Sequence, residues 1–314
     1  MVEAAHVVEA ARRIRGIAQR TPVMTSRSFD REAGVHALFK CENFQLGGAF
    51  KIRGAANFLL SLTEGELRRG VVAYSSGNHA QAVAIAAARA GAKATLVMPH
   101  DAPKSKVEAT AATGAHIIRY DRFRESREEI GNRISAETGA TLVPPFDHPW
   151  IIAGQGTAAL ELLEEAPEVD AIITPIGGGG LLSGCSLIAA ESKPGIRIFG
   201  AEPEIANDTW LSFQRGDRVE IPAPETIADG LRSQKPGAIT FPILKRLVEQ
   251  VILVSEHEIK ETVKFLLSRL KILVEPSGAV PAAAVLFRKL PPGIRSIGAV
   301  LSGGNMDLDL LVSF

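Results

Sequence analysis

Gly47-Gly48-Ala49-Phe50-Lys51-Ile52-Arg53-Gly54 is the stretch around which the 314-residue chain is organised. Glycines lie on both sides of its single lysine, and an aromatic residue precedes that lysine. A lysine attacks carbonyl groups only as a free amine, so a catalytic lysine needs a site that lowers its pKa. The octamer alone also suits a surface lysine at a helix start, because lysine side chains are mostly exposed. The rest of the chain has to decide between these two interpretations.

The composition is typical of a soluble globular protein, with 46% hydrophobic and 22% charged residues. The length suggests two domains or one large one. The 35 basic residues balance the 35 acidic ones, so no positive surplus indicates nucleic acid as a partner. The sequence contains neither a signal peptide nor an apolar stretch of roughly 18 residues, so no membrane partner is expected. Cys41 and Cys185 lie too far apart for a metal pair and are expected to be buried thiols. We expect a cytoplasmic protein.

Apolar runs alternate with helical patterns along most of the chain, which predicts parallel sheets with crossover helices. Strands are expected at residues 35–40, 70–74, 94–98, 115–120, 170–175, 197–201, 250–254 and 296–301. Helices are expected at residues 2–15, 53–62, 80–90, 104–113, 122–138, 152–165 and 256–270, and two more are expected after the glycine run to about residue 190 and after residues 275–279 to about residue 287. Residues 207–215 are expected to form a helix or a turn. Residues 216–240 are expected to form a long irregular crossing. A composition shift near residues 141–149 marks a boundary between two α/β units.

Ligands of such sheets bind beyond the carboxyl ends of strands, and a run of four glycines, residues 177–180, occupies one of these positions. Consecutive glycines let backbone N–H groups converge on an anion, and the following helix adds a positive dipole. The run matches neither common nucleotide motif. Phosphate binding is the favoured interpretation, and a flexible turn is the alternative.

Three further strand-end loops carry polar groups. Residues 75–79 (SSGNH) could hold a carboxylate or simply cap a helix, and His79 alone is more typical of a structural histidine. Residues 302–305 (SGGN) suit an ordinary turn as well as a site. Glu202 and Asp208 lie near one turn and could bind a hard cation such as Mg²⁺ or Ca²⁺, although spacing alone favours solvated loop charges.

Together and in this order, these segments resemble the fold-type II pyridoxal-phosphate enzymes of the serine/threonine dehydratase and serine racemase group. The resemblance covers essentially the whole chain. It is carried by residues 48–54 (GAFKIRG), 75–79 (SSGNH), 152–157 (IAGQGT), 177–180 (GGGG), 202–208 (EPEIAND), 226–230 (TIADG), 275–278 (EPSG) and 302–305 (SGGN).

The resemblance implies two open-sheet α/β domains with helices on both faces, similar to the tryptophan synthase beta subunit. Residues 1–66 and 147–314 would form a large cofactor-binding domain, and residues 67–146 a small mobile one. It also implies a homodimer or homotetramer. The chain stops soon after Asp307, so we expect no C-terminal regulatory domain of the ACT type.

The resemblance also implies a role for each site residue. Lys51 would hold pyridoxal 5'-phosphate covalently, and Ser76 would lie where racemases have their second base. The cofactor contacts would be Phe50, Asn78, Gly177, Gly178, Gly179, Gly180, the backbone of Leu181, Gly230 and Ser302. The substrate carboxylate would be bound by Ser75, Ser76, Asn78 and His79. A divalent cation, Mg²⁺ or Ca²⁺, would be bound by Glu202, the carbonyl of Ala206 and Asp208.

Two departures from the family pattern are visible. Ala49 replaces a frequent serine, which is expected to affect cofactor contacts more than the covalent chemistry. Asn207 stands where serine racemases commonly have a second aspartate, which leaves the two end carboxylates intact.

The expected activity is a threonine or serine dehydratase, which eliminates water from a small hydroxy amino acid. A serine racemase is the close alternative, because both reactions start from the same carbanion. A non-catalytic ligand-binding relative would have no need of Lys51. A dinucleotide oxidoreductase is the least favoured, because GxGxxG with an acidic residue about 20 positions later is missing.

Overall fold

The computed structural model describes residues 2–75, 77–102, 104–121, 123–312 and 314. Its larger sheet has six strands in the order β1-β2-β10-β7-β8-β9. All neighbouring strands in it are parallel except β1 and β2. The strands are β1 (Val23–Thr25), β2 (His36–Cys41), β7 (Ala171–Pro175), β8 (Arg197–Pro203), β9 (Gln250–Val254) and β10 (Ser296–Leu301).

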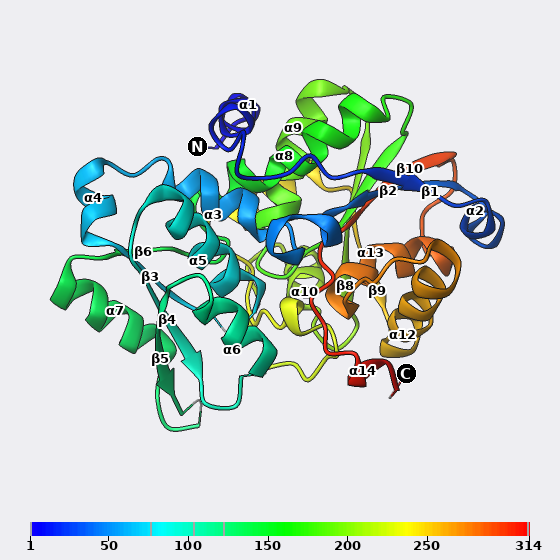
Figure 1. The fold of residues 1–314 in the computed structure, drawn as a ribbon. Helices are drawn as coiled ribbons and strands as arrows, with labels where there is room; N and C mark the ends of the chain where they lie inside the picture. Colours follow the sequence, from blue (N-terminus) through cyan, green and yellow to red (C-terminus); the bar gives the residue numbers. More distant parts are fainter. Residues whose placement is uncertain (1, 76, 103, 122, 313) are drawn as a thin grey trace.

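The second sheet has four parallel strands in the order β5-β4-β3-β6. These strands are β3 (Val71–Tyr74), β4 (Ala94–Pro99), β5 (His116–Tyr120) and β6 (Thr141–Leu142). Figure 1 shows this sheet with α4 to α7 as one lobe and the six-stranded sheet as the other. The predicted strands and the two-sheet α/β fold class are therefore confirmed, while the domain limits at residues 66 and 146 stay a prediction.

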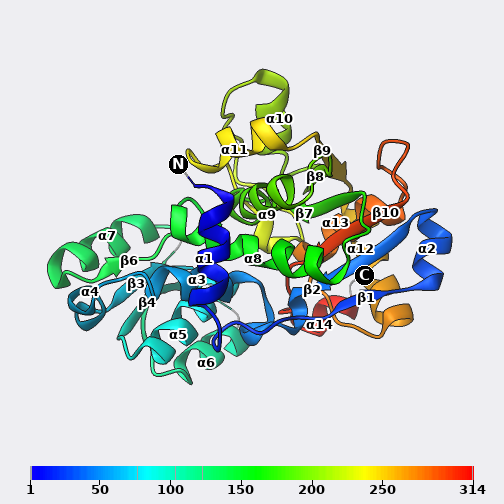
Figure 2. The ribbon, with the colours of Figure 1, turned by 90° about the horizontal axis from the view of Figure 1, so that it is seen from above.

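The helices lie on both faces of the larger sheet (Figures 1 and 2). Alternate residues of β2 point to opposite sides: Phe39 packs with the core formed by α12 and α13, and Leu38 with the core formed by α8 and α9. The main helices are α1 (Ala4–Arg13), α2 (Arg27–Ala33), α3 (Lys51–Leu59), α4 (Glu64–Arg69), α5 (Asn78–Ala90), α6 (Lys104–Ala111), α7 (Arg127–Thr138), α8 (Pro149–Glu165), α9 (Gly180–Ser192), α10 (Asp208–Arg215), α11 (Thr240–Leu247), α12 (Glu256–Phe265), α13 (Pro276–Leu286) and α14 (Asp309–Val312).

Several boundaries differ from the predictions because capping residues decide them. Helix α7 begins at Arg127 instead of 122, since the Ser126 side chain accepts the Glu129 N–H. Helix α8 begins at Pro149 instead of 152, because His148 caps it and proline suits the first helical position. Helix α12 continues as a π-helical turn, Leu266–Leu270.

Six short elements, β1, β6, α2, α4, α11 and α14, are not in the predicted set. Helix α4 is stabilised by a capping box between Thr63 and Glu66. Helix α11 follows the predicted irregular crossing, and its N-terminus is satisfied by Asp147, about ninety residues earlier in the chain. A local sequence pattern cannot predict a helix whose N-terminal N–H groups are satisfied by such a distant residue. Both cysteines are buried and free, as expected.

Candidate active site

The strand order of the large sheet gathers the predicted site loops at one edge. Strands β2, β10, β7 and β8 are consecutive parallel neighbours, so their carboxyl ends lie side by side. The loops that follow them contain, in the same order, the Lys51 octamer, residues 302–305, the glycine run 177–180, and residues 204–207. Segments more than two hundred residues apart in the chain thereby become neighbours.

The Lys51 loop is hydrogen-bonded to residues 302–305 along its backbone. The Phe50 N–H donates to the Ser302 carbonyl over 3.0 Å, and the Gly304 N–H donates to the Gly48 carbonyl over 2.9 Å. Gly48 has a φ of +71°, and a Cβ there would overlap the Asn305 side chain. The glycine before Lys51 is therefore required by both backbone conformation and close approach.

Lys51 is the first residue of α3 and is partly buried. Its Nζ donates to the Pro145 carbonyl over 2.9 Å and lies 5.0 Å from the centre of the Phe50 ring. Burial lowers the pKa of Lys51 to about 8, against the opposing effect of the Glu275 carboxylate. A free amine is therefore accessible near neutral pH, which favours the reactive interpretation of Lys51 over the solvated one.

The glycine run connects β7 to the N-terminus of the 13-residue helix α9. Gly179 caps α9 with a φ of +93° and has no side chain to satisfy the first N–H groups. Leu181 is buried in the first turn, and the Gly230 carbonyl lies close to Gly177. These N–H groups and the positive end of the helix dipole suit an anion.

The loop after β3 begins helix α5 at Asn78. The Asn78 side chain donates to Glu275 over 2.7 Å and accepts from Asn305 over 3.0 Å. The Ser75 hydroxyl accepts the Gly77 N–H over 3.3 Å. Ser76, the predicted second base, lies outside the described residues.

His79 is buried, and its Nε2 lies 3.0 Å from the Val143 carbonyl. Burial and the nearby Lys51 charge lower the pKa of His79 to about 3, so the ring is neutral and Nε2–H donates. The imidazole therefore offers no positive charge to a substrate carboxylate. Its backbone N–H, in the first turn of α5, is the group that could contribute.

Glu202 and Asp208 are both buried. Glu202 accepts from the backbone N–H groups of Thr209 and Trp210, over 3.3 and 3.0 Å. Among the described residues, no hydrogen-bond partner reaches either carboxylate oxygen of Asp208. Burial raises the pKa of Asp208 to about 7 and, together with the Asp208 charge, raises that of Glu202. Two buried carboxylates beside the buried Ala206 fit a hard cation, although no group of three acidic, histidine or cysteine ligands occurs in the described part of the chain.

Sequence reasoning did not assign Glu275, Asn305 or Pro145 to the site. Glu275 and Asn305 together hold the Asn78 amide, and the Pro145 carbonyl holds the Lys51 amine. The strings EPSG and SGGN contain two of these residues, but a string does not show which side chains meet. Nothing in the sequence around Pro145 signals its contact.

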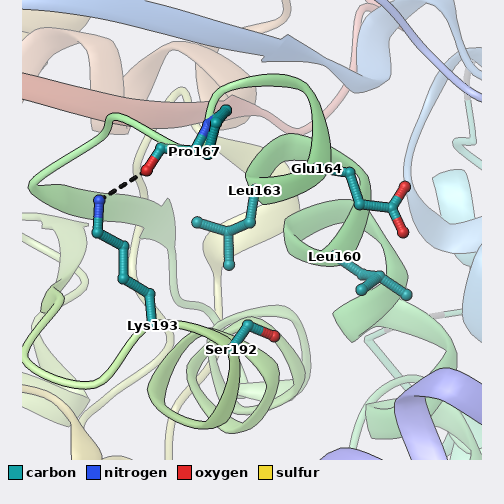
Figure 3. Close-up of a pocket in the computed structure, with 6 residues that line it drawn as sticks. All are labelled: Leu160, Leu163, Glu164, Pro167, Ser192 and Lys193. Atoms are coloured by element: carbon teal, nitrogen blue, oxygen red, sulfur yellow. Dashed lines mark hydrogen bonds between the residues drawn. The ribbon is translucent and has the colours of Figure 1, made fainter.

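A hollow of about 290 Å³ is separate from this site, and Figure 3 shows the residues that line it. It lies between the C-terminal ends of α8 and α9, so the length of α9 separates it from the glycine run. Lys193 there donates to the Pro167 and Val169 carbonyls.

Within the described residues, no helix is long and apolar enough to cross a membrane.

The amine of Lys51 and the glycine run in this two-sheet fold suit a cofactor that carries both a carbonyl group and a phosphate. A family model for pyridoxal-phosphate-dependent enzymes matches residues 14–303, and the chain belongs to that family, in its fold-type II branch. The resemblance inferred from the sequence is thereby confirmed.

Individual relatives cover nearly the whole chain. It is 48% identical over 302 residues to the L-threo-3-hydroxyaspartate ammonia-lyase of Saccharomyces cerevisiae, covering 96% of this chain and 93% of that one. It is 45% identical over 308 residues to the serine racemase of Schizosaccharomyces pombe, covering 98% and 95%. The solved structure of maize serine racemase superimposes with a TM-score of 0.96 at 45% identity, covering 99% and 96%.

Proposed function

We propose that this protein is a pyridoxal-phosphate-dependent ammonia-lyase that removes water from L-threonine or L-serine. The products would be 2-oxobutanoate or pyruvate, with ammonia. The observation that carries the proposal is the partly buried Lys51 amine, whose lowered pKa suits both carbonyl attack and proton transfer. The bound cofactor supplies an electron sink for charge that develops at the substrate Cα.

We propose that residues at this sheet edge hold the cofactor. Lys51 is proposed to hold it covalently, with Phe50 and Gly230 beside the ring and Asn78 directed at the ring oxygen. The N–H groups of residues 177–181 would take the phosphate. Ser302 would meet the ring nitrogen with a neutral hydroxyl, which does not force protonation of that nitrogen as a carboxylate would.

In the proposed reaction the substrate amine would displace Lys51 from its covalent bond, and the freed Lys51 Nζ would then take the Cα proton of the substrate. The β-hydroxyl leaves with a proton as water, and the released enamine hydrolyses to a 2-oxo acid and ammonia. Ser75, Ser76, Asn78 and the backbone of His79 would hold the substrate carboxylate at the N-terminus of α5. The pull of the Glu275 carboxylate on the Lys51 charge would help the amine to keep the proton that it removes.

Serine racemase is a second candidate, because relatives named for that activity match almost the whole chain. The same proton removal serves both reactions, and racemisation would need Ser76 to return a proton from the opposite face. The similarity to a hydroxyaspartate ammonia-lyase makes L-threo-3-hydroxyaspartate a further substrate to compare.

We further propose that Glu202, Asp208 and the Ala206 carbonyl bind Mg²⁺ or Ca²⁺, because the Asp208 oxygens are buried without a partner in the described structure. We also propose that the protein is a homodimer or homotetramer in the cytoplasm and that its ligand is a small hydroxy amino acid. The proposal also includes the domains predicted from the sequence, a large domain of residues 1–66 and 147–314 and a small mobile domain of residues 67–146.

The deciding experiment incubates the purified protein separately with L-serine, L-threonine and L-threo-3-hydroxyaspartate and measures 2-oxo acid and D-serine. We expect 2-oxo acid from serine or threonine as the main product. Dominant D-serine would replace the lyase assignment by the racemase one. The protein should also show a visible band that borohydride removes and that Lys51→Ala lacks, and a colourless protein that gains no band with added pyridoxal phosphate would refute the cofactor assignment.

A further inference from the structure

The glycine run has no side chains with which to fix the orientation of its own peptide groups. An anion site built from backbone needs its N–H groups turned toward the anion and its carbonyls turned away. Glycine permits either orientation at little steric cost, so the run alone leaves this choice open. Something outside the run has to hold it.

The Gly178 carbonyl accepts hydrogen bonds from two donors, one in the first residue of α11 and one just before the helix. The Thr240 hydroxyl donates to it over 2.8 Å, and the Gly237 N–H donates over 3.2 Å. Thr240 is fully buried, so water does not compete for this bond. A carbonyl that faces Thr240 and Gly237 does not face an anion at the start of α9.

Thr240 is itself held by Asp147. The Asp147 carboxylate accepts the backbone N–H groups of Ala238, Ile239 and Thr240, over 2.8, 2.9 and 3.2 Å. These are among the N-terminal donors that α11 leaves without a carbonyl partner of its own. Asp147 therefore fixes the position of the helix that presents the Thr240 hydroxyl.

The neighbours of Asp147 connect the same support to Lys51. The Pro145 carbonyl accepts the Lys51 amine. The Phe146 ring packs so closely on Gly178 that a Cβ there would overlap it. Residues 145–147 thus contact both the amine and the glycine run, the two ends between which a phosphorylated aldehyde would have to fit.

We propose that Thr240, held in place by Asp147, is a positioning residue for phosphate binding: its hydroxyl keeps the Gly178 carbonyl turned away from the anion site. The inference rests on the proposed cofactor site and names a residue that supports it without contacting the cofactor. Removal of one sheltered hydrogen bond of this kind costs about 1 kcal/mol, which corresponds to roughly threefold to tenfold in affinity.

The test compares pyridoxal 5'-phosphate with pyridoxal, which lacks the phosphate. Both form the same bond to Lys51, so the ratio of their dissociation constants isolates the contribution of the phosphate site. Apo wild type and Thr240→Val are titrated with each ligand, and binding is followed by the visible absorbance. We expect Thr240→Val to weaken phosphate-ester binding roughly threefold to tenfold while pyridoxal binding changes less than about twofold.

Two controls accompany this comparison. Thr240→Ser keeps the hydroxyl and should keep the wild-type ratio. Thr262→Val removes a buried threonine hydroxyl that bonds within α12, away from the glycine run, and should also leave the ratio unchanged. If Thr240→Val does not fold, Asp147→Asn replaces it. Loss of the carboxylate charge weakens the support of α11, so this variant should also bind pyridoxal 5'-phosphate more weakly relative to pyridoxal.

The outcomes separate this inference from the proposed function. A wild-type protein with equal affinity for both ligands would overturn the phosphate site itself. A wild type that prefers the phosphate ester, with the same preference in Thr240→Val or its Asp147→Asn substitute, would overturn the role of Thr240 alone. Equal weakening of both ligands in the variant would show a general structural role and would overturn it too.

Discussion

Lys51 shows how a residue that is usually solvated becomes reactive through its position. Because burial lowers its pKa to about 8, the amine loses its proton well below the usual pH of lysine. We predict that the rate at which apo protein gains its visible band with pyridoxal phosphate rises with pH and levels off above an apparent pKa of about 8. Stopped-flow absorbance between pH 6.5 and 10 measures this, with Lys51→Ala as the variant without a band. A rate that keeps rising beyond pH 10 would contradict the assigned environment.

Gly48 shows that close packing also restricts which residue a position near the site can hold. Gly48→Ala would place a methyl group on the Asn305 side chain, in a backbone conformation that L residues rarely adopt. Gly91 has a similar φ of +68°, but a Cβ there would meet nothing within 4 Å. We predict a loss of about 1 kcal/mol in unfolding free energy for Gly91→Ala and about 3 kcal/mol for Gly48→Ala, from denaturant unfolding. Equal losses would mean that the contact with Asn305 is unimportant.

At the scale of elements, a buried charge cluster fixes the first turn of α3. The Arg53 guanidinium, two residues after Lys51, is fully buried and pairs with Glu42 over 2.7 and 2.8 Å. Its other two hydrogen bonds to carboxylates reach Glu161, over 2.7 and 2.8 Å. Burial alone would lower the pKa of Arg53, but the two carboxylates outweigh it and raise the pKa, so the residue stays charged.

Removal of one partner should therefore be costly. We predict that Glu42→Gln lowers the unfolding free energy by about 3 kcal/mol, because it leaves a buried guanidinium undercompensated. The matched control is Glu249→Gln in the exposed pair with Arg197, for which we expect less than about 1 kcal/mol. Thermal and denaturant unfolding of both variants measure this. Comparable small losses would show that water reaches the Arg53 cluster.

The same elements show how far the sequence carries a prediction. Strands such as β7 and β10 were predictable because each is a short, wholly buried apolar run before a glycine-rich loop. The start of α11 was not, since its N-terminal N–H groups are satisfied by Asp147 from a distant segment. Lys51 and the glycine run could be identified as candidates from residue type and spacing. The bond between Asn78 and Glu275 joins residues far apart in the chain, and only the sheet order brings them together.

At the scale of the whole molecule, the site lies where the two lobes meet. Asn78 and Gln81 belong to α5, beside the four-stranded sheet, whereas Glu275, Gly47 and Asn305 belong to segments around the six-stranded sheet (Figure 1). The Asn305 amide donates to the Gly47 carbonyl over 2.7 Å, to Asn78 over 3.0 Å and to Gln81 over 3.3 Å. One side chain thus connects the Lys51 loop to the helix that is proposed to bind the substrate carboxylate.

Asn305→Asp removes these donors and adds a negative charge against two side-chain oxygens. We predict that amide hydrogen exchange in α5 becomes roughly fivefold to thirtyfold faster, because the lost contacts are worth about 1 to 2 kcal/mol, while exchange in β7 and β10 stays unchanged. Asn43→Asp is the control, since the Asn43 amide donates to the Leu273 carbonyl, a contact that does not involve α5. Faster exchange in both lobes alike would mean that Asn305 supports the fold as a whole. Exchange that accelerates in α5 alone would identify Asn305 as the link through which the two lobes shape one site.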